Sequence, residues 1–162
     1  MISAVDLSKR RRMVSSAAPE SAGDALPAFE LVPPGVLRDR LNDQVLRGLK
    51  TATSRLLVMD KMSGTERESA GTRMRLLDSS GEQAAVIEIA RTVIAPFGSI
   101  GAEVSEAEGE WLAEPAEWRA AHTRYWTSLL PGIRSFLSDD GWELTDETPV
   151  IVRFFHLIKE DR

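Results

Sequence analysis

The sequence predicts a mixed α+β fold, in which a mostly antiparallel sheet or small β-barrel carries helices on its outside. Alternating apolar and polar residues mark two neighbouring segments, 72–78 and 84–97, which are separated by a short turn and therefore indicate a hairpin. Helical periodicity marks two other segments, one starting near Pro34 and one starting near Pro115. Strands that pair with their neighbours along the chain favour an antiparallel sheet.

Composition is typical of one water-soluble domain. The chain has 162 residues, a length at which one domain can bury a core without metal or disulfide support. It has no cysteine, which excludes disulfides, thiol catalysis and cysteine-bound metal clusters. No apolar run approaches the roughly 18–20 residues that a membrane span needs. We therefore expect no membrane partner and a cytoplasmic location.

Charge limits the kind of nucleic-acid contact that the chain can make. The formal net charge is −5 at pH 7, and non-specific affinity for nucleic acid comes mainly from basic side chains that neutralise phosphates. Any contact with nucleic acid is therefore expected to be local. With two histidines in the chain, a histidine-rich metal site is not expected.

The first 26 residues differ in composition from the rest. A basic cluster at residues 9–12 is followed by Ser, Ala, Pro and Glu and not by an apolar segment, so this stretch does not resemble a signal peptide. We interpret residues 1–26 as a flexible arm, with an RNA-anchoring arm as the alternative. Residues 27–162 then form the folded domain.

A helix and a tight stop precede Lys50. The helix has apolar residues four apart, at Leu37, Leu41, Val45 and Leu49. Pro34 suits its first turn, and Gly48 can end it in a left-handed conformation. Lys50 is therefore expected just beyond a helix terminus.

The remaining segments follow in a simple order. Residues 60–71 are polar and contain glycine, so we expect a surface loop that could cover a site. Residues 79–81 suit a hairpin turn. The helix from Pro115 has a strong apolar stripe and should break at Pro131, and residues 148–158 read as a strand covered on both faces.

Residues 48–55 carry a gapped motif, G-x-K-x-x-T-x-R, formed by Gly48, Lys50, Thr53 and Arg55. This motif resembles the signature of the ASCH superfamily. The resemblance extends from Phe29 to Leu157 through "AAVIEIARTVIAPFGSI", "EAEGEW" and "EWRAAHTRYW", in the order that the longer bacterial members have. It implies a β-barrel related to the PUA domains of RNA-modifying enzymes.

The resemblance also implies a cleft that binds RNA or a nucleoside. One branch of the superfamily hydrolyses the acetyl amide of N4-acetylcytidine, and other members are ribonucleases. Carried over by motif, the catalytic residues are Lys50, Thr53 and, through the A-x-x-E match in "AEGE", Glu110; Arg55 and Gly48 are substrate-binding positions. Which of Glu106, Glu108 and Glu110 faces the cleft stays open.

These residues suit two reactions. In amide hydrolysis Thr53 would be the nucleophile, Lys50 its base if burial lowers the lysine pKa, and Glu110 the proton shuttle. In RNA cleavage the ribose 2′-hydroxyl attacks, and Lys50 and Arg55 neutralise the developing charge. We expect no cofactor and no metal, although a divalent ion held by carboxylates remains an alternative.

The favoured function is therefore an RNA- or nucleoside-binding ASCH protein that acts as a hydrolase. Two alternatives remain: a non-catalytic RNA-binding module, and a protein-interaction domain in which the motif only supports the fold. His122 lies in the apolar stripe of its helix and is expected to be a hydrogen-bonded core residue. The sequence leaves open the exact substrate, the oligomeric state and the role of the arm.

Overall fold

The computed structural model describes residues 25–159, so the predicted arm over residues 1–26 lies almost wholly outside the described part. The strands are β1 (Ala28–Phe29), β2 (Ala52–Leu56), β3 (Arg73–Leu77), β4 (Gln83–Pro96) and β5 (Pro149–Ile158). The α-helices are α1 (Val36–Leu46), α2 (Leu57–Ser63), α3 (Ala102–Glu108), α4 (Pro115–Ser128) and α5 (Leu130–Leu137). Two short 3₁₀ turns are η1 (Phe97–Ser99) and η2 (Glu110–Leu112).

The described strands form one five-stranded sheet in the order β1-β3-β4-β5-β2. β1 is parallel to β3, and every other pair is antiparallel. The mixed α+β class is therefore confirmed. The predicted closure into a barrel is not: β1 is two residues long and α3 packs against β2, so the two edge strands do not pair within the described residues.

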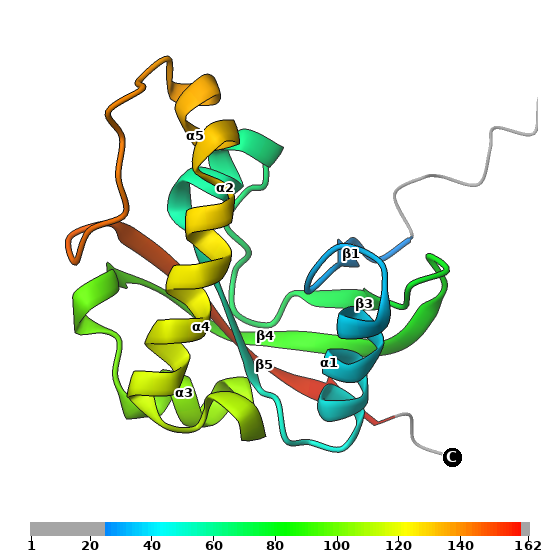
Figure 1. The fold of residues 1–162 in the computed structure, drawn as a ribbon. Coiled ribbons are helices and arrows are strands. Elements are labelled where there is room, and N and C mark those ends of the chain that lie inside the picture. The colour runs from blue at the N-terminus through cyan, green and yellow to red at the C-terminus, as the bar shows by residue number, and fades with distance from the viewer. Residues whose placement is uncertain (1–24, 160–162) are drawn as a thin grey trace, which may run out of the picture.

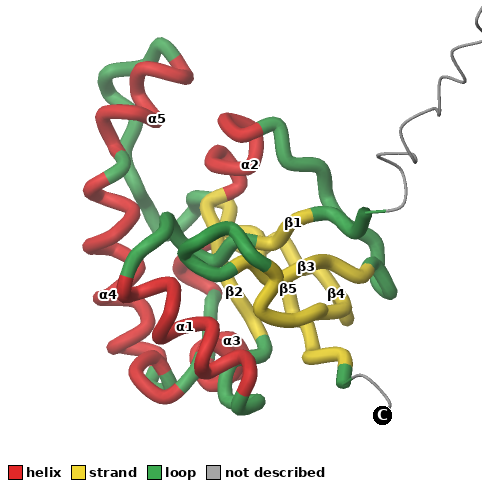
Figure 2. The backbone as a smooth tube through the Cα atoms, turned by 90° about the vertical axis from the view of Figure 1, so that its right-hand side faces the viewer, coloured by secondary structure: helices red, strands yellow, loops and turns green. Residues whose placement is uncertain are grey.

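Two long central strands, β4 and β5, connect the two halves of the molecule (Figure 1). In one half α3 and α4 lie against the sheet and α5 packs against α2, and in the other half α1 lies beside β1 and β3 (Figures 1 and 2). Each half has its own buried apolar cluster. The cluster under α4 includes Leu56, Trp118, Trp126 and Ile133.

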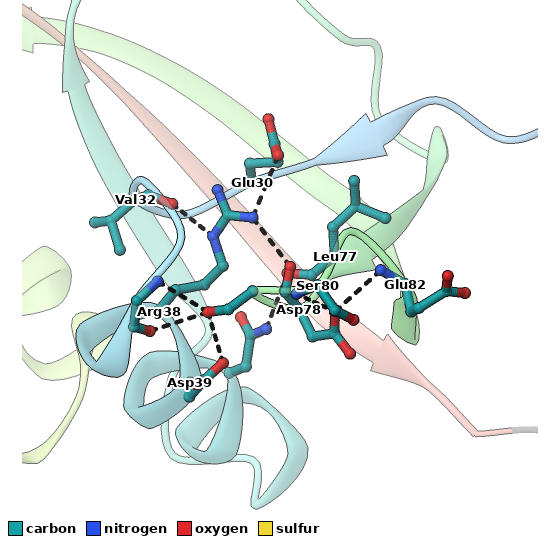
Figure 3. Close-up of polar contacts among 11 residues, drawn as sticks. Glu30, Val32, Arg38, Asp39, Leu77, Asp78, Ser80 and Glu82 are labelled. Carbon is teal, nitrogen blue, oxygen red and sulfur yellow. Dashed lines mark hydrogen bonds and ion pairs between the residues drawn. The ribbon is translucent and has the colours of Figure 1, made fainter.

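The β3–β4 hairpin forms where the sequence predicts it, and Asp78 shapes its turn. The Asp78 carboxylate accepts hydrogen bonds from the backbone and hydroxyl of Ser80 and from the backbone of Glu82 (Figure 3). Gly81 takes the left-handed conformation that the turn requires, at φ 84°. The hydrogen bond from the Ser80 side chain, with those from the backbone, lowers the pKa of Asp78.

Helix α1 buries a polar face that the sequence pattern does not predict. Leu37 of the expected apolar stripe is 54% exposed, whereas Arg38 and Asn42 are buried. Arg38 donates to the carbonyls of Val32 and Asp78, and Asn42 donates to the carbonyl of Leu77 (Figure 3). These side chains satisfy backbone carbonyls at the end of the hairpin, which explains why polar residues are buried there.

The break between α4 and α5 agrees with the sequence prediction, whereas part of the loop predicted at residues 60–71 is helical. α4 ends and α5 begins around Leu129, close to the predicted break at Pro131. Residues 57–63, however, form α2, part of which falls in the predicted 60–71 loop. Within residues 25–159, no helix has the length and apolar character needed to cross a membrane.

Candidate functional site

The turn between α1 and β2 positions Lys50. Gly48 adopts a left-handed conformation, at φ 74°, and the carbonyl of Gln44 accepts hydrogen bonds from the backbone N–H groups of Leu49 and Lys50. Open space surrounds the position that a Gly48 Cβ would take. Gly48 therefore acts here through its backbone conformation, by turning Lys50 inward.

The Lys50 side chain is buried although it carries an ammonium group, with 4% of the residue exposed. Its Nζ donates to the carbonyl of Ala52 at 2.8 Å and to the carbonyl of Glu108 at 3.3 Å. Burial lowers the pKa of Lys50, because it disfavours the charged form, and the nearby Glu108 carboxylate opposes this only in part. Lys50 is thus the kind of lysine that can serve as a proton acceptor.

Glu108, at the end of α3, lies against His122 of α4. The Glu108 Oε2 and His122 Nε2 atoms are 3.1 Å apart, and the His122 Nδ1 lies 2.8 Å from the Trp118 carbonyl. Since a carbonyl can only accept, the Nδ1 atom of His122 carries a proton, and the Nε2 atom faces the Glu108 carboxylate. An imidazole and a carboxylate at this distance form a pair suited to proton transfer.

The electrostatic balance keeps Glu108 ionised. Burial by itself would raise the pKa of this carboxyl, but the Lys50 ammonium and the hydrogen bond with His122 together outweigh burial and lower it. The Trp118 ring stacks on the His122 ring, with 4.2 Å between centroids, and so fixes the orientation of the imidazole. Packing thus positions both members of the pair.

Two polar atoms at this place lack partners within the described residues. The Ser54 hydroxyl faces the Glu108 carboxylate without reaching hydrogen-bond geometry, and Glu108 Oε1 is likewise unpartnered although both atoms are buried. Buried polar atoms without partners are rare and call for an explanation such as ligand binding. We refer to Lys50, Ser54, Glu108 and His122 as the Lys50 cluster.

The three glutamates among which the sequence could not choose, Glu106, Glu108 and Glu110, take different places in the structure. Glu108 is buried and its backbone carbonyl accepts a hydrogen bond from Lys50, whereas Glu106 is exposed. Glu110, the predicted catalytic acid, begins η2, and its side chain lies outside what the structure describes. Its backbone follows Gly109, whose added Cβ would approach Gln44 Oε1 to 2.1 Å, so this segment packs tightly against α1.

Thr53 and Arg55 lie on the opposite face of β2 from Ser54. Side chains alternate along a strand, and the face that carries Ala52, Ser54 and Leu56 packs under the helices. The motif residues therefore separate into two groups, with Lys50 on the helix side of β2 and with Thr53 and Arg55 on the other side.

On that other side lies a network of buried charges that we call the Arg153 cluster, formed by Arg55, Asp60, Glu68 and Arg153. Arg153 of β5 donates from Nε to Glu68 at 2.6 Å and from an Nη to Asp60 at 2.7 Å. Arg55 Nε is 3.4 Å from the other Asp60 oxygen. Burial alone would lower the pKa of Arg153, but its bonds to Asp60 and Glu68 raise it.

An open groove lies beside the Lys50 cluster. Its volume is about 360 Å³, and its lining comprises Val36, Asp39, Arg40, Asp43, Gln44, Arg47 and Trp111. The Arg40 guanidinium lies over the Trp111 ring at 4.3 Å, and Trp111 is 45% exposed. Gln44 connects the groove to Gly109 and thus to the back of the Lys50 cluster.

Sequence reasoning did not select Ser54, Asp60, Glu68 or Arg153. A signal was present for Arg153, because it is the one cation in the apolar segment 148–158 and a buried guanidinium needs carboxylate partners. For Glu68 and Asp60 no sequence signal was available, since they lie 85 and 93 positions from Arg153. Within residues 25–159, no group of three or more His, Asp or Glu residues is arranged to hold a metal ion.

Comparisons with solved structures show the fold. The ASCH domain of Lactobacillus crispatus JV V101 superposes with a TM-score of 0.69 at 18% identity, over 82% of this chain and 79% of that one. Protein EF3133 of Enterococcus faecalis V583 superposes with a TM-score of 0.65 at 22% identity, over 83% of this chain and 76% of that one. The comparison with curated proteins gives no match.

Comparison with protein families agrees with these structures. The sequence model of the ASCH domain matches residues 31–159, which include both the Lys50 and the Arg153 clusters. This match covers most of the chain, and it contains the whole described sheet except β1. The chain belongs to the ASCH domain family.

Proposed function

We propose that this chain binds RNA or a modified nucleoside and acts as a hydrolase, with an N4-acetylcytidine-like amide as the favoured substrate. The observation that carries the proposal is the burial of Lys50 beside Glu108 and His122, whose carboxylate and imidazole are 3.1 Å apart. Strongly perturbed titratable groups that contact one another are typical of acid–base centres. Membership of the ASCH family supports the nucleic-acid ligand.

The Lys50 cluster contains the groups that amide hydrolysis needs. A hydroxyl attacks the acyl carbon and gives its proton to the neutral Lys50 amine, whose lowered pKa favours this form. The Glu108–His122 pair donates a proton to the leaving N4 amine as the C–N bond breaks. Water then attacks the acyl ester and gives a proton back to the Glu108–His122 pair, while Lys50 returns its proton to the hydroxyl oxygen as the ester bond breaks and acetate leaves.

Two hydroxyls are candidates for the nucleophile. Thr53 follows from the family motif but lies on the face of β2 opposite Lys50, whereas the Ser54 hydroxyl faces the Glu108 carboxylate on the Lys50 side. Glu110 retains its motif-based role as a second candidate proton shuttle. Direct attack by water, with Glu108 as the base, needs neither hydroxyl.

Ribonuclease activity fits the same family but is less well supported. Phosphodiester cleavage needs a cation free to neutralise the developing charge. Arg153 and Arg55 are both engaged by Asp60, and Lys50 donates to two carbonyls. Amide hydrolysis needs no such cation, so it agrees better with these contacts.

A non-catalytic RNA-binding module is the second candidate, and the groove beside α1 favours it. An exposed tryptophan next to arginine side chains can stack an unpaired base. Trp111 and Arg40 provide this pair, and the acidic Asp39 and Asp43 balance Arg40 and Arg47. Such a neutral lining suits a nucleobase better than a phosphate chain.

Turnover separates the two functions. Purified protein is incubated with N4-acetylcytidine and, separately, with a mixed-sequence RNA, and release of acetate and shortening of RNA are measured. Under the proposal acetate is released, and Lys50→Ala and Glu108→Gln reduce the rate at least about 100-fold. Glu106→Gln is the matched control, because Glu106 is an exposed glutamate of the same helix.

Further variants assign the remaining roles. A large loss in Ser54→Ala with little change in Thr53→Ala identifies Ser54 as the nucleophile, and the reverse identifies Thr53. Little change in either favours direct attack by water. Glu110→Gln tests the motif-based acid in the same assay. If RNA binds and neither substrate is consumed, the hydrolase proposal is wrong and the binding module is supported.

A further inference from the structure

We infer that Arg153 and Arg55 form a binding site for a phosphate group of RNA or of a nucleotide, and that Glu68 occupies this site while no ligand is bound. The inference rests on the proposed function, because it names how that ligand would be held and what competes with it. It concerns the face of β2 opposite the Lys50 cluster.

Arg153 is the centre of this site. Its side chain is 3% exposed, and its guanidinium donates to one carboxylate on each of two separate segments, Asp60 in α2 and Glu68 in the loop after α2. Arginine presents its N–H groups in a planar fork that fits carboxylate and phosphate oxygens alike. A carboxylate bound to this fork therefore takes the place that a phosphate oxygen can take.

Threonines lie opposite Arg153 on both neighbouring strands. Arg153 is directly opposite Thr53 in β2 and directly opposite Thr92 in β4. Residues opposite each other in a sheet point to the same face. The Thr92 hydroxyl is buried and has no hydrogen-bond partner within the described residues. Arginine and threonine side chains on one face of a sheet are groups that commonly contact phosphate.

The two carboxylates differ in how firmly they are held. Asp60 belongs to a helix and is buried, with Arg153 on one oxygen and Arg55 near the other. Glu68 belongs to an irregular loop, residues 64–72, that begins at a left-handed glycine and contains another, Gly64 at φ 65° and Gly71 at φ 88°. Glu68 is therefore the partner that can leave without disturbing a helix.

The net charge of the site becomes positive when Glu68 leaves. With Asp60 and Glu68 in place, the two carboxylates balance the two guanidinium groups of Arg55 and Arg153. Without Glu68 one positive charge is uncompensated in a poorly solvated place, which favours binding of an anion. The loop also lies against β4, because the Arg67 side chain donates a hydrogen bond to the backbone carbonyl of Thr92.

Glu68→Gln tests the inference, and Glu66→Gln is the matched control. Both changes remove one negative charge from the same loop, but Glu66 is exposed and Glu68 contacts Arg153. Binding of inorganic phosphate and of a mixed-sequence single-stranded RNA is measured by calorimetry at low salt, with thermal unfolding as the check on folding. The two ligands distinguish a site for free phosphate from one that needs the RNA chain.

We expect Glu68→Gln to bind at least one of the two ligands about tenfold more tightly than the natural chain. A tenfold gain corresponds to a site that Glu68 occupies about nine-tenths of the time in the natural chain. Glu66→Gln should change affinity less than about twofold. Adding Arg153→Lys to Glu68→Gln should abolish the gain, because lysine keeps the charge but lacks the fork. Equal affinities in Glu68→Gln and Glu66→Gln for both ligands would overturn the inference.

The outcome is separable from that of the proposed function. If acetate release fails in every variant while Glu68→Gln still gains affinity, the hydrolase proposal is wrong and the phosphate site stands. If acetate is released while Glu68→Gln and Glu66→Gln bind alike, the hydrolase proposal stands and the phosphate site is wrong.

Discussion

Removing the Glu108 charge should destabilise the protein strongly. Glu108→Gln keeps the side chain's size but leaves the buried Lys50 ammonium and the His122 ring without the carboxylate that offsets them. Removing one partner of a buried ion pair costs about 3–5 kcal/mol when the two charges are in contact, whereas Lys50 Nζ contacts the backbone carbonyl of Glu108 and not its carboxylate. Because Lys50 can lose its proton instead of remaining charged, we expect about 3 kcal/mol, the lower end of that range.

A double-mutant cycle tests the cause of that loss. Lys50→Met removes the ammonium and retains an apolar chain of similar length, so that the double variant with Glu108→Gln contains no uncompensated lysine charge. We expect the double variant to lose at least about 1 kcal/mol less than the sum of the single losses. The free energy of unfolding is measured by urea denaturation at pH 7, with Glu106→Gln expected to stay within about 0.5 kcal/mol of the natural chain.

The result that refutes this reasoning is additivity. If the free energies of unfolding of the two single variants add to that of the double variant within about 0.5 kcal/mol, Lys50 and Glu108 do not interact. Lys50 and Glu108 would then be two independent buried residues, and the lowering of the Glu108 pKa that is attributed to Lys50 would have no basis.

Three further outcomes follow from the same structure. The pKa of Glu108 is lowered from 4.5, so the stability that its ionised form contributes is present above pH 4.5 and is lost as pH falls below it. Between pH 7 and 3.5, the free energy of unfolding measured by urea denaturation should therefore fall less in Glu108→Gln than in the natural chain. Gly109→Ala places a Cβ against Gln44 at a φ of 117°, and should lower the unfolding free energy by at least about 1 kcal/mol, whereas Gly101→Ala, with open space, should change it less. Ile133→Ala removes a fully buried side chain and should lower the thermal midpoint as expected for about 2–5 kcal/mol, which a near-zero change would contradict.

The elements were largely predictable from local pattern. Alternation identified the β3–β4 hairpin and its turn at residues 79–81, and the run of residues 148–158 identified β5 as a covered strand. Pro131 predicted the break between α4 and α5. These features depend on residues close together in sequence, which is why the pattern was sufficient.

The errors arose where distant groups decide burial. Of the predicted apolar stripe of α1, Val45 is buried in the core but Leu37 is exposed. Arg38 and Asn42 are buried as well, because hairpin carbonyls 40 and 35 residues away accept their hydrogen bonds. Part of helix α2 was assigned to a loop because residues 60–63 are mostly polar. The burial of Asp60 depends on Arg153, which lies on the last strand. No local window contains both members of such a pair.

The candidate site was predictable only as a set of residues. The motif placed Lys50 just after a helix stop, as found, and the acidic segment placed a glutamate near it. Which glutamate lies near Lys50 depends on how the chain leaves α3. Glu108 is buried there, where its carboxylate and Lys50 act on each other's charge, and Glu106 is exposed. His122 was expected to be a hydrogen-bonded core residue, and its bond to the Trp118 carbonyl agrees, but its contact with Glu108 depends on how α4 packs on α3.

The ionisation of Lys50 is the most direct test of the acid–base centre. The lysines of the chain are Lys9, Lys50, Lys61 and Lys159, so their ¹³Cε signals can be followed individually by NMR as pH rises, with Lys50→Met assigning the Lys50 signal. We predict that this signal titrates at a pH clearly below 10.5 while Lys61 serves as the exposed comparison. A Lys50 signal that titrates together with Lys61, or above it, would contradict the account.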